Sequence, residues 1–171
     1  MDAGGPVTLL CFDPALRTTG VALFVDGRLV DAYAARPRVP GRGPKAWGEA
    51  AAAIWSPLLD HLVDVVVLEG QVIYPHSVAD PNDVLQVAGV AGGLAAVAVS
   101  LGATVVHYDP AAWKGQAPKE VIAARSRARL SVGELAAIRP GRASTLDTWD
   151  AIGLGLHHLR IRPALHPGVT P

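Results

Sequence analysis

Five short apolar segments along the chain predict β-strands, at residues 7–13, 20–25, 28–34, 64–69 and 103–108. Each segment has strand length and is bounded by polar or turn-forming residues. Asp26 and Gly27 lie between the second and third segments and give a strong signal for a two-residue hairpin turn. We therefore expect the first three strands to form an antiparallel meander.

Helices are predicted between and after the later strands. The expected ranges are about 45–55, 81–101, a short turn from Asp109 through Trp113, 118–129 and about 147–160. Asp80 followed by Pro81 is a typical helix start. Strands that alternate with helices are joined by right-handed parallel crossovers, so a five-stranded mixed sheet flanked by helices is predicted. This α/β order resembles a ribonuclease H-like architecture.

The segment 81–101 is apolar on nearly all sides and rich in Gly and Ala. Such a helix must be covered on more than one side. One side can pack on the sheet, and the other can be buried within the monomer or against a second copy. It lacks the unbroken run of about 18 apolar residues that a membrane-spanning helix needs, so no membrane association is expected.

Composition restricts the class of protein. A chain of 171 residues with 50% hydrophobic residues has the size and apolar content of one globular domain, here 1–171, with a core of about 7–160 and a loose tail at 163–171. A single cysteine, Cys11, excludes a disulfide framework and a cysteine-built zinc site. The first residues have no basic segment ahead of an apolar one, so a cytoplasmic protein is expected.

Charge is balanced overall but unevenly distributed. The net charge is zero, which excludes a uniformly basic nucleic-acid binder. Residues 46–113 contain no Lys or Arg, whereas residues 114–142 contain seven. This segregation is compatible with a positive surface beside a negative pocket, or simply with solvated helix faces.

Four carboxylates stand where they could share metal ions. Asp13 and Glu69 each end a buried strand, and the ends of adjacent parallel strands open onto one crevice. Asp147 and Asp150 are three residues apart on the last helix and therefore lie on one face. Oxygen ligands favour Mg²⁺ or Mn²⁺. Taken singly, each has a structural alternative: a turn cap for Asp13, a strand end for Glu69, a helix N-cap for Asp147 and a helix-dipole partner for Asp150.

Four segments follow one another along the chain: FDPALRTTGVALF, VVVLEGQVIY, WKGQAPKEV and LDTWDAIGLGLHHL. Together they resemble the RuvC-type Holliday junction resolvases, in a form associated with phage-type members. FDPALRTTGVALF resembles the first motif of that family, and VVVLEGQVIY resembles its glutamate motif. LDTWDAIGLGLHHL is similar to the C-terminal acidic helix, and WKGQAPKEV to the basic segment before it. Together the motifs span most of residues 7–160.

The resemblance implies a divalent-metal-dependent endodeoxyribonuclease that resolves four-way DNA junctions by paired phosphodiester hydrolysis. Asp13, Glu69, Asp147 and Asp150 would then be the catalytic metal ligands, holding two Mg²⁺ or Mn²⁺ ions per site. Lys114, Lys119 and Arg125 are expected to contact DNA phosphates, and Tyr74 to stack on a base. The family acts as a homodimer, whose two-fold symmetry matches that of the junction.

Three other functions fit part of the pattern. Sugar-kinase and actin-like ATPases share the strand meander, but they need a second phosphate loop and usually two domains. A non-catalytic nucleic-acid-binding scaffold would not need four candidate metal ligands. A relaxed nuclease of the same fold that cuts flaps or forks is fully compatible with the sequence.

Overall fold

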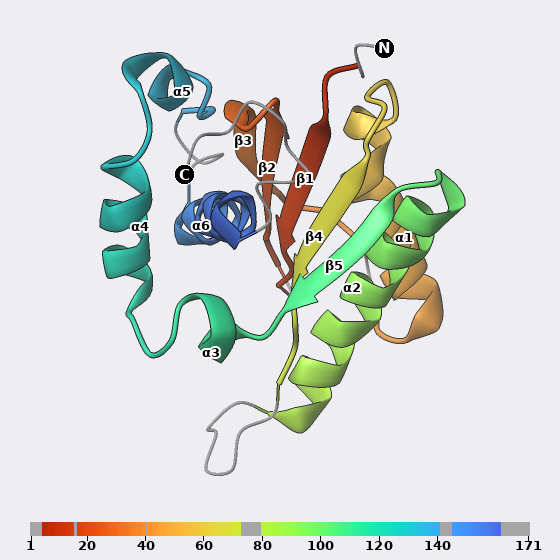
Figure 1. Ribbon diagram of the computed structural model, residues 1–171. Coiled ribbons are helices and arrows are strands. Elements are labelled where there is room, and N and C mark those ends of the chain that lie inside the picture. Colours follow the sequence, from red (N-terminus) through yellow and green to blue (C-terminus); the bar gives the residue numbers. More distant parts are fainter. Residues whose placement is uncertain (1–4, 16, 40, 73–79, 141–144, 162–171) are drawn as a thin grey trace.

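The computed structural model describes residues 5–15, 17–39, 41–72, 80–140 and 145–161. Its centre is a five-stranded sheet in the order β3-β2-β1-β4-β5 (Figure 1). The strands are β1 (Thr8–Asp13), β2 (Thr19–Val25), β3 (Arg28–Ala35), β4 (Val65–Glu69) and β5 (Thr104–Tyr108). The mixed α/β sheet predicted from the sequence is confirmed.

The pairing of the strands also follows the prediction. β1, β2 and β3 are antiparallel neighbours, whereas β4 runs parallel to both β1 and β5. Asp26 and Gly27 join β2 to β3 with φ values of 48° and 76°. Two successive positive φ values are typical of a two-residue hairpin turn whose own twist matches the right-handed twist of the strands.

Helices occupy the ranges between the strands and after them. They are α1 (Pro44–Trp55), the 3₁₀ turn η1 (Ser56–Leu58), α2 (Pro81–Ser100), α3 (Pro110–Trp113), α4 (Lys119–Arg127), α5 (Val132–Ala136) and α6 (Leu146–Ile161). Each of these elements except η1 and α5 was expected from the sequence. α5 begins with a capping box, in which Ser131 and Glu134 satisfy each other's backbone N–H groups.

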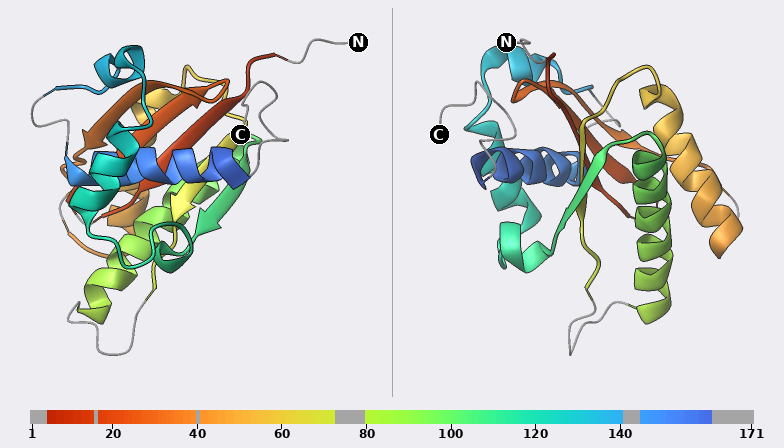
Figure 2. Two further views of the ribbon diagram at one scale, coloured as in Figure 1. Left: turned by 60° about the vertical axis from the view of Figure 1, so that its left-hand side comes forward. Right: turned by 45° about the vertical axis from the view of Figure 1, so that its right-hand side comes forward.

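Helices cover both faces of the sheet, and each face has its own apolar cluster. α1 and α2 lie on one side, and α6 lies on the other with α4 beside it (Figure 2). On the α6 side, Cys11 is completely buried, and the burial raises the pKa of its thiol. Gly155 of α6 packs against Cys11 and Phe24, where a Cβ would overlap the Phe24 ring. The glycine thus lets α6 lie close to the sheet.

One side of α2 is left uncovered. Val90, Leu94 and Ala98 are buried in the apolar cluster shared with α1 and the sheet, and Val87 is buried as well. The opposite face carries the exposed stripe Leu85, Ala88, Gly92, Ala96 and Val99, with 56% of Leu85 and 64% of Val99 accessible. By length and composition alone, α2 could also cross a membrane, a property shared by core helices of other proteins.

Candidate metal centre

The site begins at the ends of two parallel strands. β1 and β4 are hydrogen-bonded neighbours with Phe12 opposite Leu68, so the last residues of the two strands, Asp13 and Glu69, stand side by side. Both side chains are nearly inaccessible, with 4% and 6% of their surface exposed. The crevice predicted from the two strand ends is therefore present.

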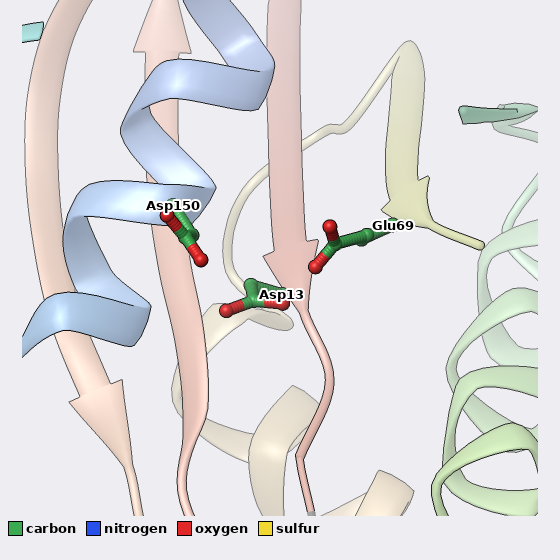
Figure 3. A group of neighbouring side chains, drawn as sticks. All are labelled: Asp13, Glu69 and Asp150. Carbon is green, nitrogen blue, oxygen red and sulfur yellow. The ribbon is translucent and has the colours of Figure 1, made fainter. Parts of the chain in front are cut away.

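A third carboxylate comes from α6. Asp150 is fully buried and points toward Asp13 and Glu69 (Figure 3). One oxygen from each of the three residues lies within 4.8 Å of those from the other two. Residues from the beginning, the middle and the end of the chain thus meet at one point.

Close docking of α6 depends on Gly20. This glycine is paired with Asp13 across the β1–β2 ladder. A Cβ built on Gly20 would overlap the backbone carbonyl of Asp147. The first turn of α6 can therefore rest directly on β2, which brings Asp150 to the end of β1.

Asp147 stands at the edge of this group and does not cap its helix. α6 is preceded by Thr145, whose hydroxyl accepts a hydrogen bond from the Thr148 N–H, while the Thr148 hydroxyl accepts one from the Thr145 N–H. The N-cap alternative for Asp147 is therefore wrong. Its carboxylate lies outside the group of three and is linked to them through Lys119.

Two lysines penetrate the carboxylate group. Lys114 Nζ lies 2.6 Å from Glu69 Oε1 and 3.2 Å from Asp150 Oδ2. Lys119 Nζ lies 2.6 Å from Asp147 Oδ1, 3.3 Å from Asp150 Oδ2 and 3.7 Å from Asp13 Oδ2. The two ammonium groups offset part of the negative charge of four carboxylates. Their expected contacts with DNA phosphates remain a prediction.

Burial and crowding shift the protonation of the site. Burial, together with the hydrogen bond and the charge of Glu69, raises the pKa of Asp13 well above its usual range. Burial also raises the pKa of Asp150, against the opposing effect of Lys114 and Lys119. For Glu69, burial is outweighed by hydrogen bonds from Asp13 and Lys114, so its pKa is lowered. Of these two neighbours, Asp13 is therefore the one whose protonated form is favoured, and Glu69 the one whose ionised form is favoured.

The sequence did not reveal that Trp113 belongs to this site. Its indole Nε1 donates a hydrogen bond to Glu69 Oε1 at 3.3 Å, and Lys114 Nζ lies 5.0 Å from the centre of its ring. A tryptophan at the end of such a short helix is more often part of an apolar core. The sequence feature that could have indicated the role of Trp113 is its position next to Lys114, shortly after the helix start at Asp109 and Pro110. The residue orients Glu69 from α3.

The donor set fits a divalent cation. Asp13 Oδ2 and Asp150 Oδ1 are buried and accept no hydrogen bond from the described residues. Buried carboxylate oxygens without donors are costly unless a cation satisfies them. An all-oxygen set is suited to Mg²⁺ or Mn²⁺. Asp13, Glu69 and Asp150 would hold such an ion, and Asp147 is placed to join them.

The remaining predicted residues are distributed more widely. Arg125 is exposed and forms no ion pair with the carboxylates, although it lines a pocket between α4 and α6, and Tyr74 falls outside the described residues. Histidines beyond the acidic pair of the last helix are by type mostly surface residues, yet His158 is completely buried and its Nδ1 lies 3.0 Å from the Tyr108 hydroxyl. The apolar face of α6 docks on the sheet and carries His158 inward with it. His157 is partly exposed.

Comparison with solved structures shows which known fold this is. The chain is similar to RuvC of Thermus thermophilus in complex with a Holliday junction substrate, with 20% identity, a TM-score of 0.66 and coverage of 96% of this chain and 99% of the other. The chain has the RuvC fold. A second Thermus thermophilus RuvC structure gives 21% identity, a TM-score of 0.65 and coverage of 94% and 98%.

The RuvC fold extends to a eukaryotic protein. The yeast mitochondrial Holliday junction resolvase Ydc2 matches with 14% identity, a TM-score of 0.58 and coverage of 94% of this chain and 81% of the other. No protein-family profile and no curated protein sequence matches this chain. The structural likeness confirms the fold expected from the four sequence motifs.

Proposed function

We propose that this protein is a divalent-metal-dependent endodeoxyribonuclease that cuts four-way DNA junctions. The observation that carries the proposal is the convergence of Asp13, Glu69 and Asp150, all buried, at the strand ends of a RuvC fold. Residues of a purely structural site would be paired throughout, whereas two buried carboxylate oxygens here accept no hydrogen bond from the described residues.

The chain's own residues would act by holding charge in a fixed geometry. When bound, divalent ions supply positive charge that makes an attacking water more acidic and stabilises the departing 3′ oxygen of a phosphodiester. The proposed ligands are Asp13, Glu69 and Asp150, with Asp147 as a fourth. Asp13 lies between Glu69 and Asp150 (Figure 3). Trp113 keeps Glu69 oriented through its indole N–H.

Lys114 and Lys119 would have two roles in this mechanism. They hold the carboxylates in place through the ion pairs described above. Because Lys119 is 43% exposed, its ammonium group can also reach a phosphate placed over the site. Cationic side chains that contact the DNA backbone position the substrate without reading its sequence.

The choice of a four-way junction as substrate is supported by the Thermus thermophilus structure, which is a complex with such a junction. The test is a cleavage assay with Mg²⁺ or Mn²⁺ on a four-way junction, a flap, a fork and a linear duplex of matched sequence. Symmetric paired cuts in the junction alone are expected. Equal cutting of flaps and forks would identify a relaxed branched-DNA nuclease, and binding without cutting would identify a scaffold.

A first prediction concerns metal and stability. Mg²⁺ or Mn²⁺ is expected to raise the melting temperature, because the cation relieves repulsion among buried carboxylates that exists only in the folded chain. The stabilisation should reach about 3 kcal/mol at a hundredfold excess over Kd. Differential scanning fluorimetry with and without chelator measures it.

The control for this experiment is Glu49→Gln, a charge removed from the exposed surface of α1. Its metal-induced shift should equal that of the wild type, whereas Asp150→Asn should abolish the shift. Equal shifts in Asp150→Asn and wild type would mean that the cation binds elsewhere.

We further propose that two copies pair through α2 as a cytoplasmic homodimer. The exposed stripe Leu85, Ala88, Gly92, Ala96 and Val99 is apolar and built mainly from small side chains. Gly92 has open space where a Cβ would stand, so a partner backbone can approach closely. Burying the stripe against its own copy would remove apolar surface from water and place two metal centres at a fixed separation.

The second prediction tests this pairing. Ala96→Glu should convert dimers into monomers, because two carboxylates would meet near the two-fold axis in an apolar interface. Light scattering at micromolar concentration should halve the measured mass. Ala128→Glu, at an exposed position after α4, introduces the same charge outside the stripe and should remain dimeric. A monomeric wild type would refute the dimer while leaving the metal chemistry intact.

A further inference from the structure

A basic pocket lies between α4 and α6, next to the metal centre but separate from it. The two helices pack side by side on the same face of the sheet (Figures 1 and 2). Between them is a cavity of about 180 Å³ whose polar lining comes from Arg125, Arg129, Arg160, His157 and Ser126. No acidic side chain of the described residues lines it.

The three arginines of this basic pocket have no acidic partner among the described residues. Arg139 pairs with Asp31, and Arg42 with Asp83. By contrast, Arg125, Arg129 and Arg160 form no ion pair with any described residue. Three guanidinium groups around one cavity repel one another, so the arrangement is stabilised by an anion placed between them.

The positive charges of the basic pocket also act on His157. Burial lowers its pKa, and the charges of Arg160 and Arg129 lower it further. The histidine ring is held edge-on against the Tyr108 ring at a centroid distance of 5.1 Å. A fixed neutral imidazole beside two arginines can donate a hydrogen bond to an anion without adding repulsion.

The basic pocket is connected to the metal centre through residues that line it. At Gly153 a Cβ would lie 3.0 Å from Ile122 and Trp113 and 3.1 Å from the Ser126 hydroxyl, so the two helices are in close contact there. Trp113 is the shared wall, because its ring edge lines the pocket while its indole N–H binds Glu69. An anion in the pocket would therefore lie a short way from a phosphate at the carboxylates.

We infer that the basic pocket is a subsite for a second backbone phosphate of the bound DNA, one that is held but not cut. Arginine is the residue best suited to this role, because its planar group binds phosphate oxygens in pairs. The inference rests on the proposed nuclease function. A phosphate anchored here would fix the DNA arm relative to the carboxylates.

The test is the salt dependence of DNA binding. A fluorescent four-way junction is titrated in chelator, which prevents cleavage, at several NaCl concentrations. The double variant Arg129→Gln/Arg160→Gln should reduce the magnitude of the slope of log K against log salt by about one, since the pocket is proposed to hold one phosphate and each phosphate contact contributes about 0.9. Arg28→Gln removes one charge at the opposite end of the strands, so its slope should equal that of the wild type.

Two further measurements separate the possible outcomes. Inorganic phosphate is titrated into the free protein while the His157 ring signals are followed by NMR. An unchanged slope in the double variant overturns the inference, and a phosphate-induced shift of His157 in that case would show a site for small anions only. Cleavage with Mg²⁺ is measured on the same proteins. If the wild type binds the junction but cuts no branched DNA, the nuclease proposal fails while the slopes still decide the role of the pocket.

Discussion

The Asp13→Asn variant is expected to bind a four-way junction with nearly wild-type affinity and to cut it more than about a hundredfold more slowly. The substitution preserves the shape of the side chain but removes the charge that a divalent ion requires, and even residues that only support metal ligands are worth 10–100-fold. Single-turnover cleavage with enzyme in excess measures the chemical step. Affinity is measured separately in chelator.

Matched variants show whether the effect belongs to the site. Glu69→Gln and Asp150→Asn should behave like Asp13→Asn, because all three carboxylates meet at one point. Asp60→Asn, in an exposed loop, should cut at the wild-type rate. Near-normal cleavage by Asp13→Asn would refute the metal centre. Asp147→Asn tests the role of Asp147. A loss of cleavage rate as large as that of the other three variants would identify a fourth ligand, and a smaller loss would identify only a partner of Lys119.

The second large effect is expected from Gly20→Ala, a change of one methyl group at a position that has no chemical role of its own. The new Cβ would overlap the Asp147 carbonyl, so the first turn of α6 must move away from β2. Overpacking of this kind costs about 1–3 kcal/mol of folding free energy. Displacement of Asp150 by about 1 Å should also slow cleavage by about a hundredfold. Denaturant unfolding and single-turnover cleavage measure the two losses.

Gly133→Ala is the matched control for Gly20→Ala. Gly133 lies in α5 with nothing within 4 Å of a built Cβ, so alanine there should leave cleavage unchanged and slightly stabilise the helix. If Gly20→Ala were as stable and active as Gly133→Ala, α6 would not depend on contact with β2.

The sequence was sufficient to predict elements whose signal is local. The strands ending in Asp13 and Glu69 are apolar runs, and their parallel pairing follows from the order of the elements. The Asp26–Gly27 turn and the Asp80 cap have equally local signatures. The capping box of α5 was also local but lay outside the apolar pattern, so the helix was missed.

The parts that could not be predicted depend on contacts between distant residues. Lys114 and Lys119 form part of a basic segment, and nothing in that segment shows that both side chains enter the carboxylate group. His158 shows the same limit, because two adjacent histidines give no sign of which one faces the sheet. Such assignments follow from how α4 and α6 dock, which is set by side-chain volumes such as those at Gly20 and Gly155.

The only cysteine of the chain is therefore a built-in probe of how the molecule opens. Thiol reagents attack the thiolate, and Cys11 is both inaccessible and held in its protonated form beneath α6. It can react only in molecules in which α6 has left the sheet, the same movement that would take Asp150 away from Asp13. The rate of alkylation of the unmodified protein thus reports, without any introduced label, how often the metal centre comes apart.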